Sequence, residues 1–148
     1  MKKIEEYIEK VGWAVISIVP TEKDPDTIPF TYTVGFIKTF NHPEVILSGL
    51  PAQLGKDLLN VIGFLIKKGE QFTHDSTTDK IAENYDVMFI NVDEKYYQEY
   101  LPIAVTYNKQ YQLPFSALQM IWPDKEGIFP NNQNYDKSFR QEILSDMI

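Results

Sequence analysis

Residues 29–50 read PFTYTVGFIKTFNHPEVILSGL, and this stretch contains two strand-like runs, Phe30–Phe36 and Val45–Leu50, joined by the polar turn 41–44. In the first run apolar side chains alternate with small or polar ones, which is typical of a strand with two different faces. The second run begins Val-Ile-Leu without alternation, which indicates a strand buried on both faces. We expect the rest of the chain to be organised around this pair.

The flanking sequence predicts further elements on both sides. Before the pair come an amphipathic helix that Gly12 ends and a β-branched strand over Trp13–Val19. After it comes a helix that starts at Pro51 and closes at Gly69. The remaining expectations are a short strand near Phe72–His74, a strand over Tyr85–Val92, a helix over Tyr96–Tyr107 with a kink or stop at Pro102, a strand over Phe115–Trp122, and a short helix near Phe139–Leu144.

This order of elements predicts an α+β fold for a single domain spanning residues 1–148. The expected sheet is mixed but mainly antiparallel, with about five or six strands, and is either open or partly closed into a barrel. Three to four helices pack against it. No internal repeat or linker divides the chain.

The composition predicts a folded, acidic protein. Hydrophobic residues make up 43% of the chain, aromatic residues 14%, and the formal net charge is −7. Residues 70–99 carry eight acids against two lysines, and Arg140 is the single arginine. Since no basic stripe is visible, binding to nucleic acid is not expected. The acidic stretch is interpreted as a solvated face, with a docking surface for a basic partner as the alternative.

The sequence also suggests where the protein works. No stretch has the apolar length of a membrane helix, and the N-terminus turns acidic at once, so we expect a cytoplasmic protein that does not enter a membrane. The absence of cysteine excludes disulfides, thiolate metal sites and a cysteine nucleophile.

The first group of candidate site residues lies in the polar turn. His42 and Glu44 stand two residues apart, next to Tyr32 and Thr33 of the preceding strand. A histidine with a carboxylate to orient it is what general acid–base catalysis requires. The alternative is structural, because short polar turns need such residues to satisfy their backbone groups.

The second group lies at the end of the last predicted strand and contains Gln119, Trp122 and Asp124. If that strand lies near the strand predicted over Phe30–Phe36, Gln119 and Asp124 face the same cavity as Tyr32 and His42. An amide, a phenol, an imidazole and a carboxylate around an aromatic pocket are typical of a small-ligand site. The alternative is a core tryptophan followed by a turn.

Motifs for other chemistries are missing from the sequence. It has no Gly-x-Gly-x-x-Gly run, Walker loop or Gly-x-Ser-x-Gly elbow, and no metal-ligand spacing around its two histidines. We therefore predict no metal site and name no cofactor and no catalytic residue.

The combination of these motifs resembles a bacterial family of unknown function, domain of unknown function 4262. The resemblance rests on the Tyr-Thr-x-Gly strand at Tyr32, the His-Pro-Glu turn at His42, the Gly-Leu-Pro helix entry at Gly49, and the Gln-x-x-Trp-Pro-Asp strand end at Gln119. It spans the chain from Gly12 to Pro130 and implies no settled activity. A more distant similarity to flavin-binding split barrels is an analogy of strand order only.

Three functional hypotheses follow. The first is a bacterial or phage binding module that holds a small ligand or a protein partner, for example as an immunity or anti-defence protein, at Tyr32, Thr33, His42, Glu44, Gln119, Trp122 and Asp124. The second is an enzyme, either a flavin-dependent oxidoreductase or a hydrolase with His42 as base and Glu44 as its orienter. The third is a structural role for both turns, with function at an oligomer interface. A homodimer is one option for the assembly.

Overall fold

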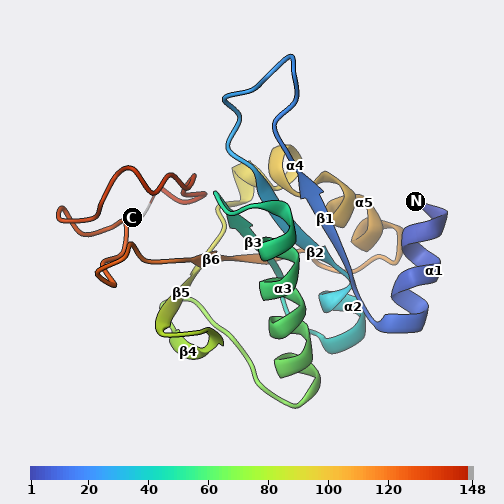
Figure 1. Ribbon diagram of the computed structural model, residues 1–148. Helices are drawn as coiled ribbons and strands as arrows, with labels where there is room; N and C mark the ends of the chain where they lie inside the picture. Colours follow the sequence, from blue (N-terminus) through green and yellow to red (C-terminus); the bar gives the residue numbers. More distant parts are fainter. Residues whose placement is uncertain (147–148) are drawn as a thin grey trace.

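A computed structural model of the protein describes residues 1–146 and shows one mixed sheet between two layers (Figure 1). The strands run in the order β1-β2-β3-β6-β5-β4. Their bounds are β1 Ala14–Ile18, β2 Phe30–Val34, β3 Glu44–Ser48, β4 Thr77–Ala82, β5 Tyr85–Asn91 and β6 Ala117–Ile121. The α-helices are α1 Lys2–Val11, α2 Phe36–Phe40, α3 Ala52–Lys67, α4 Tyr97–Tyr100 and α5 Pro102–Gln110, with a 3₁₀ turn at Glu94–Tyr96.

The sheet confirms the predicted α+β class and leaves the barrel alternative without support. β3 and β6 pair in parallel, and every other neighbouring pair is antiparallel. β1 and β4 are the two edges of the described sheet, so it is open. β3 is buried along its whole length, as the uninterrupted apolar run predicts.

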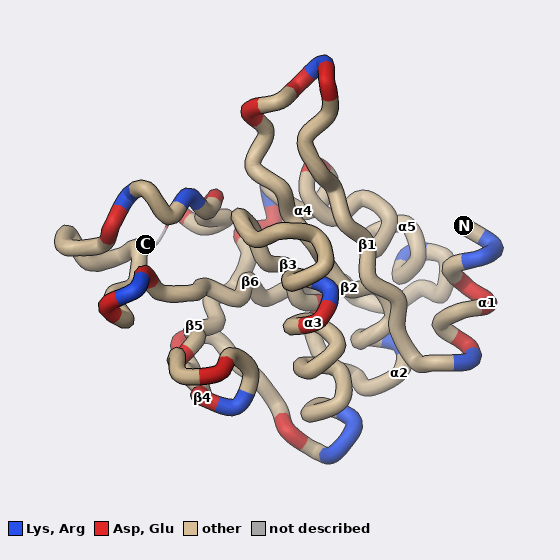
Figure 2. The backbone as a smooth tube through the Cα atoms, viewed as in Figure 1, with Lys and Arg blue, Asp and Glu red and all other residues tan. Residues whose placement is uncertain are grey.

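Each face of the sheet carries its own core. On one face α3 lies against the strands, and Leu59, Ile62 and Ile66 pack with Leu47 and Met120. On the other face α1 and α5 pack against the sheet (Figure 1), and Leu144 of the C-terminal segment belongs to the same core. Figure 2 shows charged residues on α1, on α3, on the loops, around β4 and on the C-terminal segment, whereas Glu44 of the central strand β3 is buried.

Two glycines allow α3 to approach the sheet closely. A Cβ added at Gly63 would overlap the indole ring of Trp13, and one at Gly55 would lie 2.9 Å from Oγ1 of Thr31. Glycine usually destabilises a helix interior, but at these two positions it allows the helix to contact the sheet closely. Trp13 is almost fully buried as a result, and its Nε1–H donates a hydrogen bond to Asn60 at 3.0 Å.

The structure corrects three of the expected elements. The strand predicted over Phe30–Phe36 is β2, and it ends at Val34, because Gly35 adopts φ 116° and turns the chain into α2. The alternating pattern does not reveal this turn. In residues 71–84 the strand lies at Thr77–Ala82 and not near Phe72–His74. The segment near Phe139–Leu144 has a bend at Phe139 and no regular secondary structure, so it is not helical. The predicted stop at Pro102 is confirmed, because it separates α4 from α5.

The C-terminal segment, residues 138–146, is held by buried side chains of the sheet. The amide of Gln119 donates to the carbonyl oxygen of Glu142 at 2.6 Å and accepts from the N–H of Leu144 at 2.8 Å. Ser48 Oγ accepts from the N–H of Glu142 at 2.8 Å. Leu144 then fills part of the core beneath. Backbone groups that an irregular segment would leave unpaired are thereby satisfied.

Replacing Gly63 with alanine tests the contact between α3 and the sheet. Alanine normally stabilises a helix interior relative to glycine, but here its Cβ meets Trp13, so we expect a loss of about 1–3 kcal/mol in the free energy of unfolding. Urea denaturation measures this loss. The same change in a Trp13→Phe background should cost less, because the smaller ring leaves room. An equal or greater cost in that background would contradict the contact.

Candidate functional site

The carboxylate of Glu44 is the most heavily hydrogen-bonded group among the predicted site residues. It accepts from Oγ1–H of Thr33 at 2.8 Å and from the backbone N–H groups of Gly35, Phe36 and Ile37 at 3.1, 3.0 and 3.2 Å. The amide of Asn108 on α5 adds a fifth donor at 3.4 Å. Glu44 is fully buried, so this carboxylate joins β2, α2, β3 and α5 inside the protein.

The local sequence explains why the donors converge. Gly35 has a left-handed conformation and ends β2, so the N–H groups that begin α2 have no partner within the helix. Glu44, the first residue of β3, brings its side chain to these groups, and the positive end of the short helix favours a carboxylate there. Thr33 Oγ1 also accepts from the N–H of Val45 at 2.9 Å, which connects β2 to β3.

Burial and hydrogen bonding act on Glu44 in opposite directions. Burial raises the pKa of this carboxyl to about 7, although each bond from Thr33 and the α2 backbone lowers it. The pKa of Tyr107 is also raised, to about 12. Burial is the main cause, and the nearby Tyr111 and Glu44 add to it. Glu44 is therefore a group that titrates near neutral pH inside the core.

His42 is also buried, and its imidazole has hydrogen-bond partners other than Glu44. Its Nδ1 lies 2.8 Å from the carbonyl oxygen of Pro43, and Nε2 accepts from the N–H of Phe72 at 3.1 Å. This pattern fits one neutral tautomer, with the proton on Nδ1. Burial lowers the pKa of His42, which favours the same neutral form. The imidazole thus anchors residues 71–73 to the turn, and the structure pairs it with backbone groups and not with Glu44.

The other polar residues predicted for the site lie in separate places. The hydroxyl of Tyr32 accepts from the N–H of Ile103, and Gln119 holds the C-terminal segment. Asp124 accepts from the N–H groups of Glu126, Ile128 and Asp136 at 2.8–3.0 Å, which closes the turn after β6. Within residues 1–146, Asp124 and His42 line different pockets, and neither pocket includes Tyr32 or Gln119, so these side chains do not share the predicted cavity.

A different cavity opens beside Trp122, between α3, β5, β6 and the C-terminal segment. We call it the Trp122 pocket; its volume is about 540 Å³. Its walls are mainly apolar, and they include Leu54, Leu58, Val87, Met120, Trp122 and Phe139. The Nε1–H of Trp122 donates to the carbonyl oxygen of Ser48 at 2.8 Å, which fixes the ring in the wall. Of the predicted site residues, Trp122 and Asp124 line this pocket.

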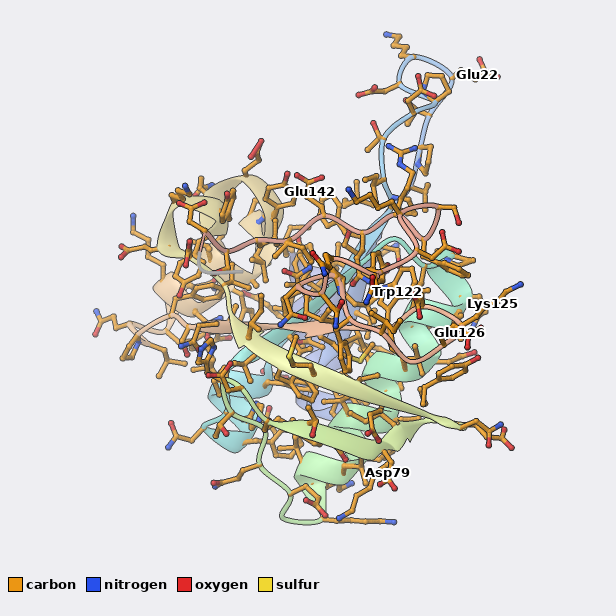
Figure 3. All side chains as sticks on the ribbon, turned by 90° about the vertical axis from the view of Figure 1, so that its left-hand side faces the viewer. Glu22, Asp79, Trp122, Lys125, Glu126 and Glu142 are labelled. Carbon is orange, nitrogen blue, oxygen red and sulfur yellow. The ribbon has the colours of Figure 1, made fainter. Side chains whose placement is uncertain are left out.

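Charged residues stand around the pocket. Lys125 and Arg140 line it together with Glu83, and Figure 3 shows Trp122, Lys125 and Glu126 near one another after β6. Within residues 1–146 the guanidinium of Arg140 has no hydrogen bond or ion pair. Sequence reasoning missed Leu54, Leu58 and Arg140 as site residues. The one available signal was that Arg140 is the single arginine of an acidic chain.

Metal binding has no support in the described part of the chain. Among residues 1–146 no group of three or more histidine, aspartate or glutamate side chains is placed to hold a metal ion. No helix of that part is long and apolar enough to cross a membrane.

Comparison with protein families agrees with the motifs that the structure has now placed. The model of a domain of unknown function, DUF4262, matches residues 7–136, which is most of the chain. The chain belongs to the DUF4262 family. The matched region includes Thr33, His42, Glu44, Trp122 and Asp124, so the Glu44 network and one wall of the pocket lie within the DUF4262 domain. The segment with Ser138 and Arg140 lies after it.

Other comparisons add no relative to this DUF4262 member. No curated protein and no solved structure matches the chain.

The pH dependence of stability tests the Glu44 network. A carboxyl whose pKa is raised in the folded state stabilises the protein fully below its ordinary pKa, near 4.5, and this contribution is lost as pH rises through about 7. We expect this pH-dependent step in the free energy of unfolding to be on the order of 3 kcal/mol. Glu44→Gln should remove the step.

Urea denaturation between pH 4.5 and 8 measures the step, with Glu126→Gln as the control because Glu126 is exposed. Glu44→Gln should also be less stable at every pH, since its amide N–H₂ would face the donors of α2. The same pH slope in wild type and Glu44→Gln would contradict the assignment.

Proposed function

We propose that this DUF4262 protein binds a small amphipathic anion, such as an aromatic or branched aliphatic carboxylate, in the Trp122 pocket. The observation that carries the proposal is an apolar cavity of about 540 Å³ with an arginine and a lysine at its edge. Ligand sites of small molecules are usually concave and mostly apolar, with a few polar groups that fix orientation, and fall within about 300–1,000 Å³.

The apolar part of the ligand would lie between the helix and the sheet. Leu54 and Leu58 of α3 form one wall, and Met120 and Trp122 form another. Leu54 is 45% exposed, so its side chain is accessible to a ligand. Covering these side chains would contribute roughly 25 cal/mol for each Å² of apolar surface removed from water.

The acidic group of the ligand would pair with the guanidinium of Arg140, which has no hydrogen bond or ion pair in the described part of the chain. Arginine binds carboxylates through two parallel hydrogen bonds, which suits a planar acid. Two cations, Lys125 and Arg140, and two carboxylates, Glu83 and Asp124, line the pocket of a chain that is acidic overall. The carboxylate of Asp124 already accepts three backbone N–H groups, whereas the guanidinium of Arg140 has no hydrogen bond or ion pair within residues 1–146, and this difference supports an anionic ligand over a cationic one.

Catalysis by His42 has weaker support than binding. A general base needs a free nitrogen within reach of substrate, whereas both ring nitrogens of His42 have backbone partners and the ring is buried. Glu44 has five donors, and His42 is not among them. We therefore favour a binding module over the hydrolase hypothesis. A flavin cofactor, a protein partner and a cytoplasmic location stay predictions from the sequence.

Self-association of the chain is a separate proposal. It rests on strand β1, and none of the residues that line the Trp122 pocket belongs to β1.

Calorimetric titration with 4-phenylbutyrate and its neutral amide tests the binding proposal. Because Arg140 would pair with the carboxylate, we expect the acid to bind about tenfold more tightly than the amide. Arg140→Ala should abolish the difference. Lys137→Ala is the matched control, since Lys137 is an exposed cation of the same region that does not line the pocket. No binding of the acid, or an unchanged preference in Arg140→Ala, would overturn the proposal.

A further inference from the structure

Strand β1 forms one edge of the sheet, and half of its backbone groups have no partner. It pairs with β2 on one side, from Ala14 opposite Val34 to Ile18 opposite Phe30. On the other side no strand, helix or side chain within residues 1–146 bonds to it. In Figure 1 β1 lies at the front, with α3 to one side and α1 to the other, and its outer edge is uncovered. Such an edge is a template for another strand.

The pairing pattern identifies which residues point outward. The N–H of Gly49 donates to the carbonyl oxygen of Pro29 at 2.7 Å, so odd-numbered residues of β2 turn their backbone groups toward β3. Even-numbered residues of β2 then bond to β1, through Ala14, Ile16 and Ile18. The N–H and C=O groups of Val15 and Ser17 consequently face away from the sheet.

The two edges of the sheet differ in how they are protected. The opposite edge, β4, carries Asp79 and Lys80, and its register with β5 shifts between Thr78 and Ala82. Charges and register irregularities are common devices that prevent edge-to-edge pairing. β1 has the sequence Ala-Val-Ile-Ser-Ile with a regular register, and no charged residue occurs between Val11 and Thr21. Only the β4 edge is therefore protected against another strand.

Exposed apolar side chains accompany the open edge. Ile18 is 40% exposed, and Val19 directly after it is 48% exposed. Phe64 of α3 is 55% exposed and lies over Trp13 at the start of β1, with 5.4 Å between ring centroids. By strand alternation Val19 shares the face of Trp13 and Phe64, whereas Ile18 points to the opposite face, so a partner strand at this edge could cover exposed apolar side chains on both faces.

We propose that two copies of this chain pair through β1, antiparallel about a twofold axis at Ile16, and form one continuous sheet. This register places Val15 opposite the partner's Ser17, so the outward backbone groups of each copy meet those of the other. Val19 lies opposite the partner's Trp13, on the face that carries the partner's Phe64. The exposed valine and phenylalanine then cover each other.

Self-pairing fits this edge better than pairing with a different protein. A twofold interface needs one surface that complements itself, and an antiparallel strand centred on Ile16 meets that requirement with its own backbone. Each chain carries a net charge of −7, which opposes association, but β1 and its neighbours contribute no charge to the contact. Pro20 follows immediately and limits the paired segment to the strand itself.

Sedimentation velocity over a range of protein concentrations tests the proposal. We expect wild type to sediment with the mass of two chains and to dissociate on dilution. Ser17→Pro should sediment as one chain, because it removes an outward N–H and no backbone bond to β2; the one contact with β2 that it loses is between the hydroxyls of Ser17 and Thr31, 3.4 Å apart. Ile18→Lys should do the same through its charge. Circular dichroism should show that both variants keep the wild-type fold.

Leu54→Lys is the matched control, since it also puts a lysine at an exposed apolar position, on α3, and it should remain a dimer. A wild type that stays a single chain at all concentrations would overturn the proposal. So would folded Ser17→Pro and Ile18→Lys variants that still sediment as dimers, or a Leu54→Lys variant that dissociates.

Discussion

One buried carboxylate connects the parts of this fold that are distant in sequence. Glu44 receives bonds from Thr33 on β2, from three backbone groups at the start of α2, and from Asn108 on α5. An unpaired buried N–H group costs about 1–3 kcal/mol, so the sharp turn at Gly35 depends on this acceptor. With β2, β3 and α2 held in place, His42 can reach Phe72 and anchor the segment that follows α3.

The cavity depends on a second set of constraints, at the other end of the sheet. Gln119 and Ser48 are buried polar residues of the central strands, and they bind the backbone of the C-terminal segment. This holds residues 138–140 over the space beside Trp122 and brings Arg140 to its edge. Gly49 permits the close approach, because a Cβ there would collide with the carbonyl oxygen of Arg140. The segment is thus one wall of the pocket.

The sequence predicts the elements that have strong local signals. Gly12 and Gly69 both adopt left-handed conformations at the ends of helices, and Pro102 separates α4 from α5, as their residue types indicate. The sequence also identifies Thr33, His42 and Glu44 as special, because polar residues between apolar strands must find partners. Their partners could not be predicted, since Asn108 and Phe72 are brought to them by tertiary structure. The alternating pattern continues into Phe36, the first residue of α2, and hides the start of this short helix. Arg140 reaches the pocket only through contacts far along the chain.

The central claim is that the conspicuous polar residues build the scaffold, whereas ligand binding belongs to the Trp122 pocket. Amide and indole N–H chemical shifts in ¹H–¹⁵N NMR spectra, followed during a titration with 4-phenylbutyrate, test it most directly. The account predicts shifts for Leu54, Leu58, Trp122 and Arg140, with Thr33, His42 and Glu44 unchanged. Shifts confined to the residues around Glu44 and His42, or none at saturating ligand, would contradict it.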